Sequence, residues 1–307
     1  MKIAVNLINF GPGATPESLE GWVELTQRLG YHGLMTSDHV TITDDVSERY
    51  PAPFYEPMTM LGWLAGVTTD IMIGTTVSVL PYRSPLETAR AFANADQLSR
   101  GRCVLGVGVG WAAKEFEILD VAFKDRGPMT TDYLQAIKAL WASDVATYSG
   151  EFVSFDKVHT TPRPAQTPHP PIWVGGNSAP SMRRAIQHGT AWHPIRPTAT
   201  GFVDEMLPAF ERVGEQLELP LPDICPRIRL RITDEARPDD ERLAGEGSVA
   251  QITEDLAQLE ALGCTWVLLD TYHDYLVDEL RDSRFAWDMF ETVAADIVNL
   301  ADEKMRQ

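Results

Sequence analysis

The sequence of 307 residues is 44% hydrophobic and 23% charged, and its formal net charge is −18. These fractions are typical of a soluble globular protein, and the length fits one large α/β domain or two smaller domains. The negative charge argues against binding nucleic acid or an anionic membrane through a general electrostatic field.

Three features concern where the protein works. No apolar run approaches the ~18 residues that indicate a transmembrane helix, and the start, "MKIAVNLINFG", lacks the cleavage pattern of a signal peptide. Cys103, Cys225 and Cys264 are widely spaced among apolar residues, which favours buried thiols over disulfides or metal ligands. We therefore expect a cytoplasmic protein.

Eight short β-rich runs alternate with helical segments along the chain. Several runs are nearly all apolar, as strands buried on both faces of a parallel sheet should be. The segments between them place hydrophobic residues at helical spacing, for example Trp22, Leu25 and Leu29. The runs begin at Ile3, His32, Ile71, Arg102, Ile172, Thr190, Ile224 and Thr265.

Eight β/α alternations predict a (β/α)8 TIM barrel that forms a single domain over residues 1–307. A doubly wound open sheet is the alternative, because periodicity alone does not exclude it. One segment, at about 112–170 between the fourth and fifth strands, breaks the rhythm with two helical stretches, a hairpin around Gly150 and a Pro-rich run. We expect this insertion to lie over the barrel mouth.

Catalytic groups in such barrels lie where the strands run into the loops that follow them. The residues at these ends include one histidine directly after the second strand, small hydroxyls, a glycine turn and many aromatics. No cluster has metal-ligand spacing and no GxSxG sequence occurs, so we predict neither a metal site nor a serine hydrolase. The set suits a flat ring that carries a phosphate.

Two glycine-rich turns bear on that phosphate. The segment "GVGVGWAAKEFEIL" is similar to a dinucleotide-binding glycine loop, but Trp111 stands where that fingerprint needs its third glycine. We therefore do not predict a dinucleotide site there. In "PPIWVGGNSAPSMRRAIQHG", Gly175 and Gly176 lead into a helix capped by Asn177 or Ser178. Its exposed N–H groups could hold an anion. An ordinary capped helix is the alternative, and we favour a phosphate site.

Several segments, in order and spacing, resemble one family. They are "TSDHV", "IGTTVSVLPYRSP", "GRCVLGVGVGWAAKEFEIL", "RGPMTTDYLQAIKALW" and "YSGEFVSFDKVHTTPRPAQTPHPPIWVGGNS". Together they look like the bacterial luciferase-like flavin and deazaflavin oxidoreductases, from residue 1 to about residue 200. The "GVGVGW" and "PRPAQTPHPPIWVGG" forms resemble the branch that uses coenzyme F420, a deazaflavin, rather than FMN.

The resemblance assigns roles to particular residues. His39 matches the family's histidine near the reactive face of the ring, a proton donor or acceptor; without the resemblance, a loop-fixing hydrogen bond would be preferred. Asp38 would orient His39 or bond the ring edge, and Thr76–Val77 matches a non-proline cis peptide behind the ring. The implied catalytic residues are His39 and Asp38, and the implied cofactor-binding residues are Asn6, Thr75, Thr76, Val77, Gly108, Val109, Gly110, Gly175, Gly176, Asn177, Ser178 and Arg196.

The substrate pocket is expected to be apolar or aromatic. The family's sugar-phosphate dehydrogenases carry a carboxylate where Gly110 and Trp111 stand here, so sugar-phosphate oxidation is not expected. Trp111 would face the cavity or pack against the insertion, and Glu115 is expected to pair with Arg126. Candidates to line the pocket are Trp63, Trp192 and Tyr272, each of which also suits a core position.

Charge and loops bear on the cofactor. F420 ends in an oligoglutamate tail, which a chain of this net charge repels at long range. Arg83, Arg183, Arg184 and Arg196 would have to form a local positive rim, and their dispersal would favour FMN. The loops 40–56 and 234–247 are rich in Asp, Glu, Pro or Gly, and either could act as a lid.

Three functions stay open at this point. The leading one is F420-dependent hydride transfer to or from a small organic substrate, with His39 moving the proton. The second is an FMN-dependent monooxygenase supplied by a separate reductase, and the third is a non-catalytic flavin-binding protein. Homodimers are common among the proteins that the chain resembles, but nothing in the sequence requires one.

Overall fold

Parallel strands wind into one sheet in the computed structural model, which describes residues 1–273 and 276–306. The order of the strands is β10-β9-β8-β5-β3-β2-β1-β14-β11, and the short β4 (Ser78–Val79) also pairs with β5. The bounds along the chain are β1 (Lys2–Leu7), β2 (Gly33–Thr36), β3 (Met72–Thr75), β5 (Cys103–Gly108), β8 (Ile172–Gly175), β9 (Ala191–His193), β10 (Asp223–Ile224), β11 (Arg227–Arg229) and β14 (Trp266–Asp270).

The sheet closes through β10 and β11, which are two parts of one strand interrupted at Pro226. β10 pairs with β9, and β11 pairs with β14. Between them, the Cys225 N–H donates to the Trp192 carbonyl at 2.8 Å, and the Leu268 N–H donates to the Pro226 carbonyl at 2.9 Å. This seventh strand thus bonds neighbours on both sides, and the described chain is the expected (β/α)8 barrel rather than an open sheet.

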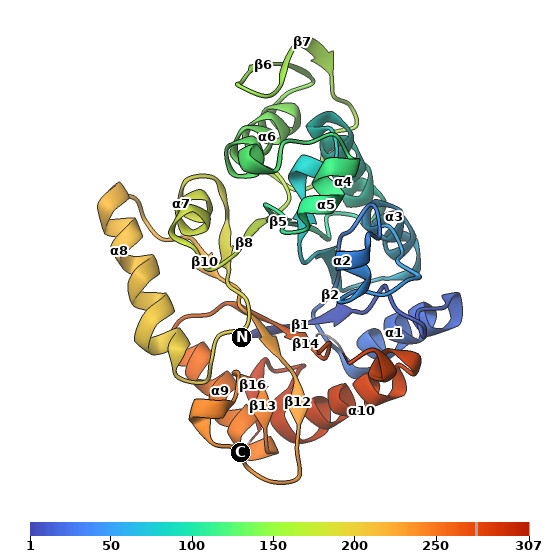
Figure 1. The fold of residues 1–307 in the computed structure, drawn as a ribbon, viewed down its shortest axis with the longest axis vertical. Coiled ribbons are helices and arrows are strands. Elements are labelled where there is room, and N and C mark those ends of the chain that lie inside the picture. The colour runs from blue at the N-terminus through green and yellow to red at the C-terminus, as the bar shows by residue number, and fades with distance from the viewer. Residues whose placement is uncertain (274–275, 307) are drawn as a thin grey trace.

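Helices surround the barrel, as Figure 1 shows. Local sequence explains where several begin: Thr15 and Ser18 form a capping box before α1, and Ser248 and Gln251 form another before α9. No helix among the described residues is long and apolar enough to cross a membrane. The helices are α1 (Pro16–Leu29), α2 (Asp44–Ser47), α3 (Pro57–Val67), α4 (Pro85–Leu98), α5 (Ala113–Ile118), α6 (Arg126–Ala142), α7 (Ala179–His188), α8 (Leu207–Leu217), α9 (Val249–Ala261) and α10 (Arg284–Thr292).

Side chains fill the barrel in layers. An apolar layer occupies the interior toward the N-terminal ends of the strands and includes Met35, Val104, Trp173 and Leu268. Strand side chains alternate between the interior and the helices, so Asp270 lies on the same side of β14 as Leu268 and begins a polar layer above it. The three cysteines are buried and unpaired.

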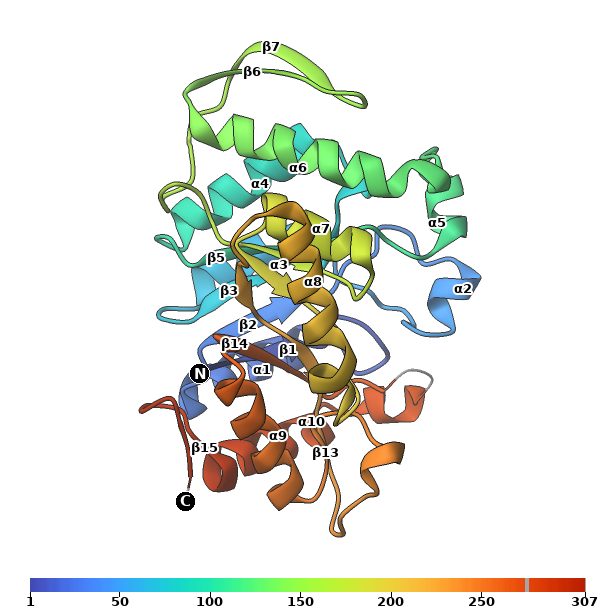
Figure 2. The ribbon, with the colours of Figure 1, turned by 90° about the vertical axis from the view of Figure 1, so that its left-hand side faces the viewer.

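The segment between β5 and β8 holds the predicted helices and hairpin, but the predicted position of the hairpin is wrong. The hairpin of β6 (Val145–Ser149) and β7 (Ser154–His159) packs along α6 on the outside of the molecule, away from the barrel mouth (Figures 1 and 2). Asp132 of α6 holds its tip by accepting the N–H groups of Phe152 and Val153. The insertion reaches the C-terminal ends of the strands through α5, which lies near α2 in Figure 2.

Short elements complete the described chain. They are the strands β12 (Arg231–Ile232), β13 (Glu246–Gly247), β15 (Val298–Asn299) and β16 (Lys304–Met305), and the helical turns at Leu80–Tyr82, Phe123–Asp125, Phe202–Met206, Asp239–Glu241, Val277–Arg281 and Val293–Ile297.

Candidate active site

A pocket opens at the C-terminal ends of the barrel strands. Its walls come from β11 and from the segments that follow β2, β3, β5, β8 and β9. This is the end of the barrel where enzymes of this fold place their reacting groups. The lining residues are Ser37, Asp38, His39, Tyr50, Thr76, Val77, Val79, Gly108, Val109, Gly110, Trp111, Gly175, Gly176, Ile195 and Arg227.

Most of the predicted site residues meet in this pocket. His39, Asp38 and the glycine turns after β5 and β8 line it, together with Thr76, Val77 and Val109. Asn6 and Thr75 are fully buried and do not line it. Asn177, Ser178 and Arg196 also lie outside its lining.

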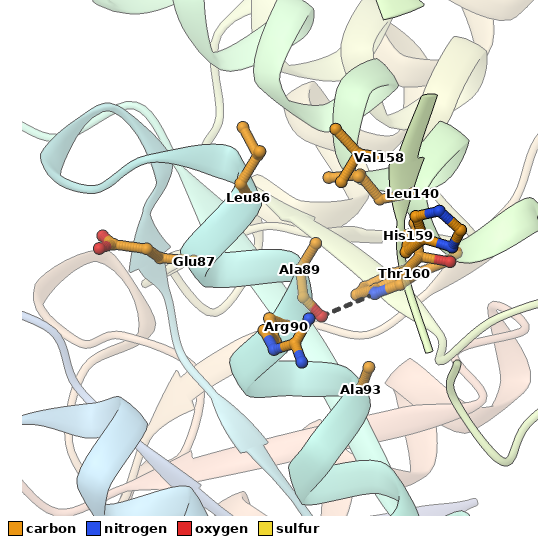
Figure 3. Close-up of a pocket in the computed structure, with 10 residues that line it drawn as sticks. Leu86, Glu87, Ala89, Arg90, Ala93, Leu140, Val158, His159 and Thr160 are labelled. Atoms are coloured by element: carbon orange, nitrogen blue, oxygen red, sulfur yellow. Dashed lines mark hydrogen bonds between the residues drawn. The ribbon is translucent and has the colours of Figure 1, made fainter. Parts of the chain in front are cut away.

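A second cavity lies outside the barrel, between α4, α6 and β7 (Figure 3). Its walls are mainly aliphatic, with Leu86, Ala89 and Leu140 among them. The Trp141 indole nitrogen donates to the Ala89 carbonyl at 2.9 Å, the bond drawn in Figure 3. No barrel strand is among the residues that line this cavity, and it takes no part in the candidate active site.

His39 is held by a carboxylate from the segment after β5. Its Nδ1 lies 2.6 Å from Oε2 of Glu115, and both side chains are buried. Oε1 of Glu115 accepts the N–H groups of Val40 and Thr41 at 2.6 and 2.9 Å. Burial acts to raise the pKa of Glu115, but His39 and these two N–H groups outweigh it and lower that pKa, so the carboxyl is ionised.

The predicted pair between Glu115 and Arg126 is therefore wrong. Arg126 donates to the carbonyl of Phe123 and stacks its guanidinium 3.9 Å from the centre of that ring. The Glu115 carboxylate instead bonds His39 and the backbone N–H groups of residues 40 and 41, so it is not directed at Arg126.

Asp38 does not orient His39, which corrects one of its two expected roles. Its carboxylate accepts a two-pronged bond from Arg83 at 2.8 and 2.9 Å. It also accepts the Val79 N–H at 2.9 Å and the Ser78 hydroxyl at 3.1 Å. Asp38 thereby ties the end of β2 to the segment after β3.

Val77 forms a bulge between two glycine turns. The Thr76–Val77 peptide is cis, as the resemblance implied. A Cβ on Gly108 would lie 2.5 Å from a methyl group of Val77, and one on Gly175 would lie 3.0 Å from the other methyl group. A Cβ on Gly106 would collide with the Thr75 carbonyl oxygen of β3. Larger residues at positions 108 and 175 would press on the bulge, and one at position 106 would overlap the strand that leads into it.

The turn before α7 keeps its backbone open to the pocket. Ser178 is the N-cap and accepts the Ser181 N–H. Asn177 binds both the N–H and the carbonyl of Ile195 with its amide, which fixes the turn against the segment after β9. Gly176 has φ of +114°, a conformation that favours glycine. Because Pro180 has no N–H group and the Ser181 N–H is bonded to Ser178, the N–H groups of residues 177–179 are the ones that could meet an anion.

The expected arginine rim does not form. Arg83 is committed to Asp38 and Glu56. Arg184 is buried and donates to the Gly127 carbonyl and the Thr131 hydroxyl, while Arg183 meets Gln216 at the surface. Arg196 is half-buried and follows Ile195.

Arg227 is a pocket residue that the sequence interpretation missed. It donates to one oxygen of Asp270 at 3.0 and 2.7 Å and to the Thr76 carbonyl at 2.7 Å. Asn6 donates to the other oxygen of Asp270 at 2.8 Å. Burial acts to raise the pKa of Asp270, but Arg227 and Asn6 lower it. A signal was present in "RIRLRI", because arginines at every second position of a strand lie on one face.

His193 is a second buried histidine, with a different environment. Its Nδ1 contacts the Cys225 carbonyl, and its Nε2 lies 3.0 Å from the Thr76 hydroxyl. Burial lowers its pKa to about 4, with Arg227 adding to the effect. The ring is therefore neutral at physiological pH, and both nitrogens are occupied by the protein.

Aromatic rings surround His39. The ring centres of Tyr50, Phe54 and Trp111 lie 5.2, 5.5 and 5.8 Å from that of His39. Trp111 is 40% exposed at the pocket mouth. Tyr50 comes from loop 40–56, whereas no residue of 234–247 lines the pocket.

The three aromatics proposed to line the pocket are elsewhere. Trp192 is fully buried and stacks on Phe210 at 4.3 Å. Trp63 packs, partly buried, against the main hydrophobic core. Tyr272 is buried against Phe10, 4.9 Å between ring centres. Sequence could not separate these core rings from the pocket rings, because both kinds are apolar and irregularly spaced.

The pocket wall contains one hydroxyl group, that of Ser37, which no described residue bonds. The Ser37 hydroxyl is buried and has no hydrogen-bond partner among the described residues. Buried hydroxyl groups are normally bonded, so an unsatisfied one in a pocket wall fits a polar ring edge. No group of three or more His, Cys, Asp or Glu in the described chain could hold a metal ion.

Comparison with known proteins identifies the family. The family model described as luciferase-like monooxygenase matches residues 4–242. The chain belongs to the luciferase-like monooxygenase family. Among relatives, the uncharacterized protein Rv0953c of Mycobacterium tuberculosis is 38% identical over 188 residues, which cover 57% of this chain and 65% of that protein.

A second relative of this luciferase-like chain has a described activity. It is the oxygenase component of flavin-dependent trigonelline monooxygenase from Acinetobacter baylyi, 30% identical over 168 residues, covering 54% of this chain and 44% of that protein. The chain thus spans less than two thirds of the length of either relative.

Solved structures with the same luciferase-like fold use two cofactors. An F420-dependent secondary alcohol dehydrogenase in complex with an F420–acetone adduct has a TM-score of 0.75 at 16% identity, over 95% of this chain and 98% of that one. The FMN-bound oxygenating constituent of 3,6-diketocamphane monooxygenase from Pseudomonas putida has a TM-score of 0.73 at 16% identity, over 96% and 97%. At such identities the likeness shows the fold alone.

Proposed function

We propose that the protein is an F420-dependent oxidoreductase that transfers a hydride between the deazaflavin and a small organic substrate. The observation that carries the proposal is His39, which lines the pocket beside the Val77 bulge with its Nδ1 held by Glu115. A bound deazaflavin would supply the hydride donor or acceptor. The protein then has to orient the substrate and move one proton.

The residues of the pocket divide these tasks. Nε2 of His39 takes the proton from the substrate oxygen in oxidation, or gives it in reduction. Val77, Gly108 and Val109 would back the ring, and the Ser37 hydroxyl would bond its edge. The N–H groups of residues 177–179, which follow the two glycines, would hold the phosphate. Arg227 places positive charge at the pocket wall.

The substrate is proposed to be apolar or aromatic. Tyr50 and Trp111 supply the pocket with large rings beside His39, and such rings prefer apolar or aromatic partners. Because Tyr50 belongs to loop 40–56, we propose this loop as the lid, and not loop 234–247.

An FMN-dependent monooxygenase is the second candidate. Arg83, Arg183 and Arg184 point to different parts of the molecule and give the oligoglutamate tail of F420 no common partner. That dispersal favours FMN, as does the 30% identity to an oxygenase component. In that case a separate reductase would be a partner, and in either case a homodimer is compatible with the fold family.

Titration of the purified protein with each cofactor separates the candidates. Quenching of F420 fluorescence at micromolar protein, with no response of FMN fluorescence, is expected. Binding of FMN alone would replace the first candidate by the second. Binding of either cofactor without turnover on a panel of alcohols, aldehydes and enones would favour a non-catalytic flavin-binding protein, and failure to bind both would remove the enzyme proposals.

A further inference from the structure

Glu115 is buried although it belongs to a short surface helix. On α5 its neighbours Lys114 and Glu117 are 61% and 71% exposed and pair with each other, whereas the Glu115 side chain is 0% exposed. Placing an ionised carboxylate inside a protein is costly unless hydrogen bonds compensate it. The three bonds to His39, Val40 and Thr41 provide that compensation, and all three partners belong to the segment after β2.

The two oxygens of Glu115 have separate tasks. Oε1 accepts two backbone N–H groups, whose directions are set by the chain, so the plane of the carboxylate is fixed. Oε2 is then directed at Nδ1 of His39. A carboxylate can only accept, so Nδ1 must carry a proton, and Nε2 is the nitrogen left to meet a ligand in the pocket.

Among the pocket residues that the structure describes, no other acid could hold His39 in this way. Asp38 is adjacent in sequence, but its two oxygens are engaged by Arg83, Ser78 and Val79. The rings of Tyr50, Phe54 and Trp111 enclose His39 through apolar contacts that do not distinguish its two tautomers. The tautomer of His39 therefore depends on Glu115.

We propose that Glu115 is a positioning residue for proton transfer: it fixes His39 as the Nδ1–H tautomer and presents Nε2 to the substrate. A carboxylate behind a histidine plays this part in the serine hydrolases, where loss of the charge leaves the ring in place but in the wrong tautomer. The inference rests on the proposed function only for the effect on turnover, because the tautomer itself is a property of the protein without cofactor.

The decisive variant is Glu115→Gln. The glutamine oxygen should stay on the Val40 and Thr41 N–H groups, which turns its NH2 group toward Nδ1. Nδ1 must then accept, and the proton moves to Nε2. Glu117→Gln is the matched control, since it makes the same change on the exposed side of α5.

Nitrogen-15 NMR of histidine-labelled protein without cofactor tests the tautomer, with the His39 signals assigned by their loss in His39→Asn. At a pH where the ring is neutral, the wild type and Glu117→Gln are expected to show Nδ1–H, and Glu115→Gln to show Nε2–H. An Nε2–H ring in the wild type, or an unchanged tautomer in Glu115→Gln, would overturn the proposal. The wild-type spectrum decides even if the variant fails to fold.

Kinetics test the consequence for turnover. Glu115→Gln should lower kcat at least tenfold with little change in KM or in the dissociation constant of the cofactor. In the His39→Asn background the same change should have no further effect, because Glu115 acts through His39. Independent, multiplying losses would refute the positioning role, whereas a protein that binds neither F420 nor FMN would refute the proposed function and leave the NMR result standing.

Discussion

His39 is expected to contribute to chemistry more than to binding. Its ring lines the pocket, while the glycine turns after β5 and β8 form other parts of the wall. His39→Ala should therefore reduce turnover by ~10²-fold or more, as the loss of a general acid or base does, with the cofactor affinity nearly intact. Steady-state kinetics and fluorescence titration measure the two quantities separately. Unchanged turnover would remove His39 from the mechanism.

Arg227 should matter for stability as well as for the site. Asp270 is 2% exposed, and Arg227 is its cationic partner at 2.7 Å. Arg227→Met leaves that carboxylate buried without a counter-charge and should lower the free energy of unfolding by about 3–5 kcal/mol. Arg28→Met is the control, because its pair with Glu291 is half-exposed on both sides and should contribute less than about 1 kcal/mol. Urea unfolding compares them, and equal small losses would contradict the role given to Arg227.

The glycine turns after β5 and β8 act together with the segment after β3. Val77 fills the space that side chains on Gly108 and Gly175 would otherwise take, and Asp38 fixes the same segment through Val79. The back wall of the pocket is therefore built by three neighbouring strands of the sheet. A substitution at the end of one of these strands should therefore disturb the backbone at the end of its neighbour.

Gly108→Ala tests this coupling. Its Cβ would lie 2.5 Å from a Val77 methyl group, so the bulge has to shift, at a cost of about 1–3 kcal/mol and with weaker cofactor binding. Gly62→Ala in α3 is the matched control, because its Cβ meets no atom within 4 Å and alanine favours a helix by about 0.5–1 kcal/mol. Thermal unfolding and cofactor titration measure both effects. If Val77→Ala fails to relieve the Gly108→Ala defect, the steric explanation is wrong.

Two histidines that are neutral in the folded protein, His193 and His273, make its stability depend on pH. Burial lowers the pKa of His193 and of His273 to about 4, and for His273 Arg229 and Arg231 add to the effect. As pH falls from about 6.5, the unfolded chain binds protons at these histidines before the folded chain does, so stability is lost between pH 6.5 and 4. Each histidine should contribute a slope of up to about 1.4 kcal/mol per pH unit.

Acidic groups extend the loss to lower pH. The pKa values of Asp270 and Glu115 are lower in the folded chain than in the unfolded chain. Their contributions to stability are therefore complete above the unfolded-state pKa and are lost as pH falls toward the folded-state pKa. Urea midpoints at pH 7.5, 6 and 5 are expected to decrease in that order. In His193→Asn the slope between pH 6.5 and 5 should become shallower. An unchanged slope would mean that another group is responsible.

Local signals predicted the barrel, with an open sheet left as the alternative, and much of the pocket. Alternating apolar runs and helical spacing arise from backbone periodicity, and eight of them leave few arrangements that bury every strand. The strand ends could then be read off, and with the family resemblance they placed His39, Val77 and Gly175 in one pocket. The resemblance also anticipated the cis bond at Thr76–Val77.

Partnerships between distant polar residues depended on the folded chain. Glu115 is 76 residues from His39, and Arg227 is 151 residues from Thr76. A carboxylate can bond any donor that the fold brings within about 3 Å, so a single sequence with many acids and arginines does not say which pairs form. The outward position of the hairpin and the burial of Trp192 were also not predictable from sequence. Both depend on how the helices and strands pack against one another, which the sequence of each element alone does not determine.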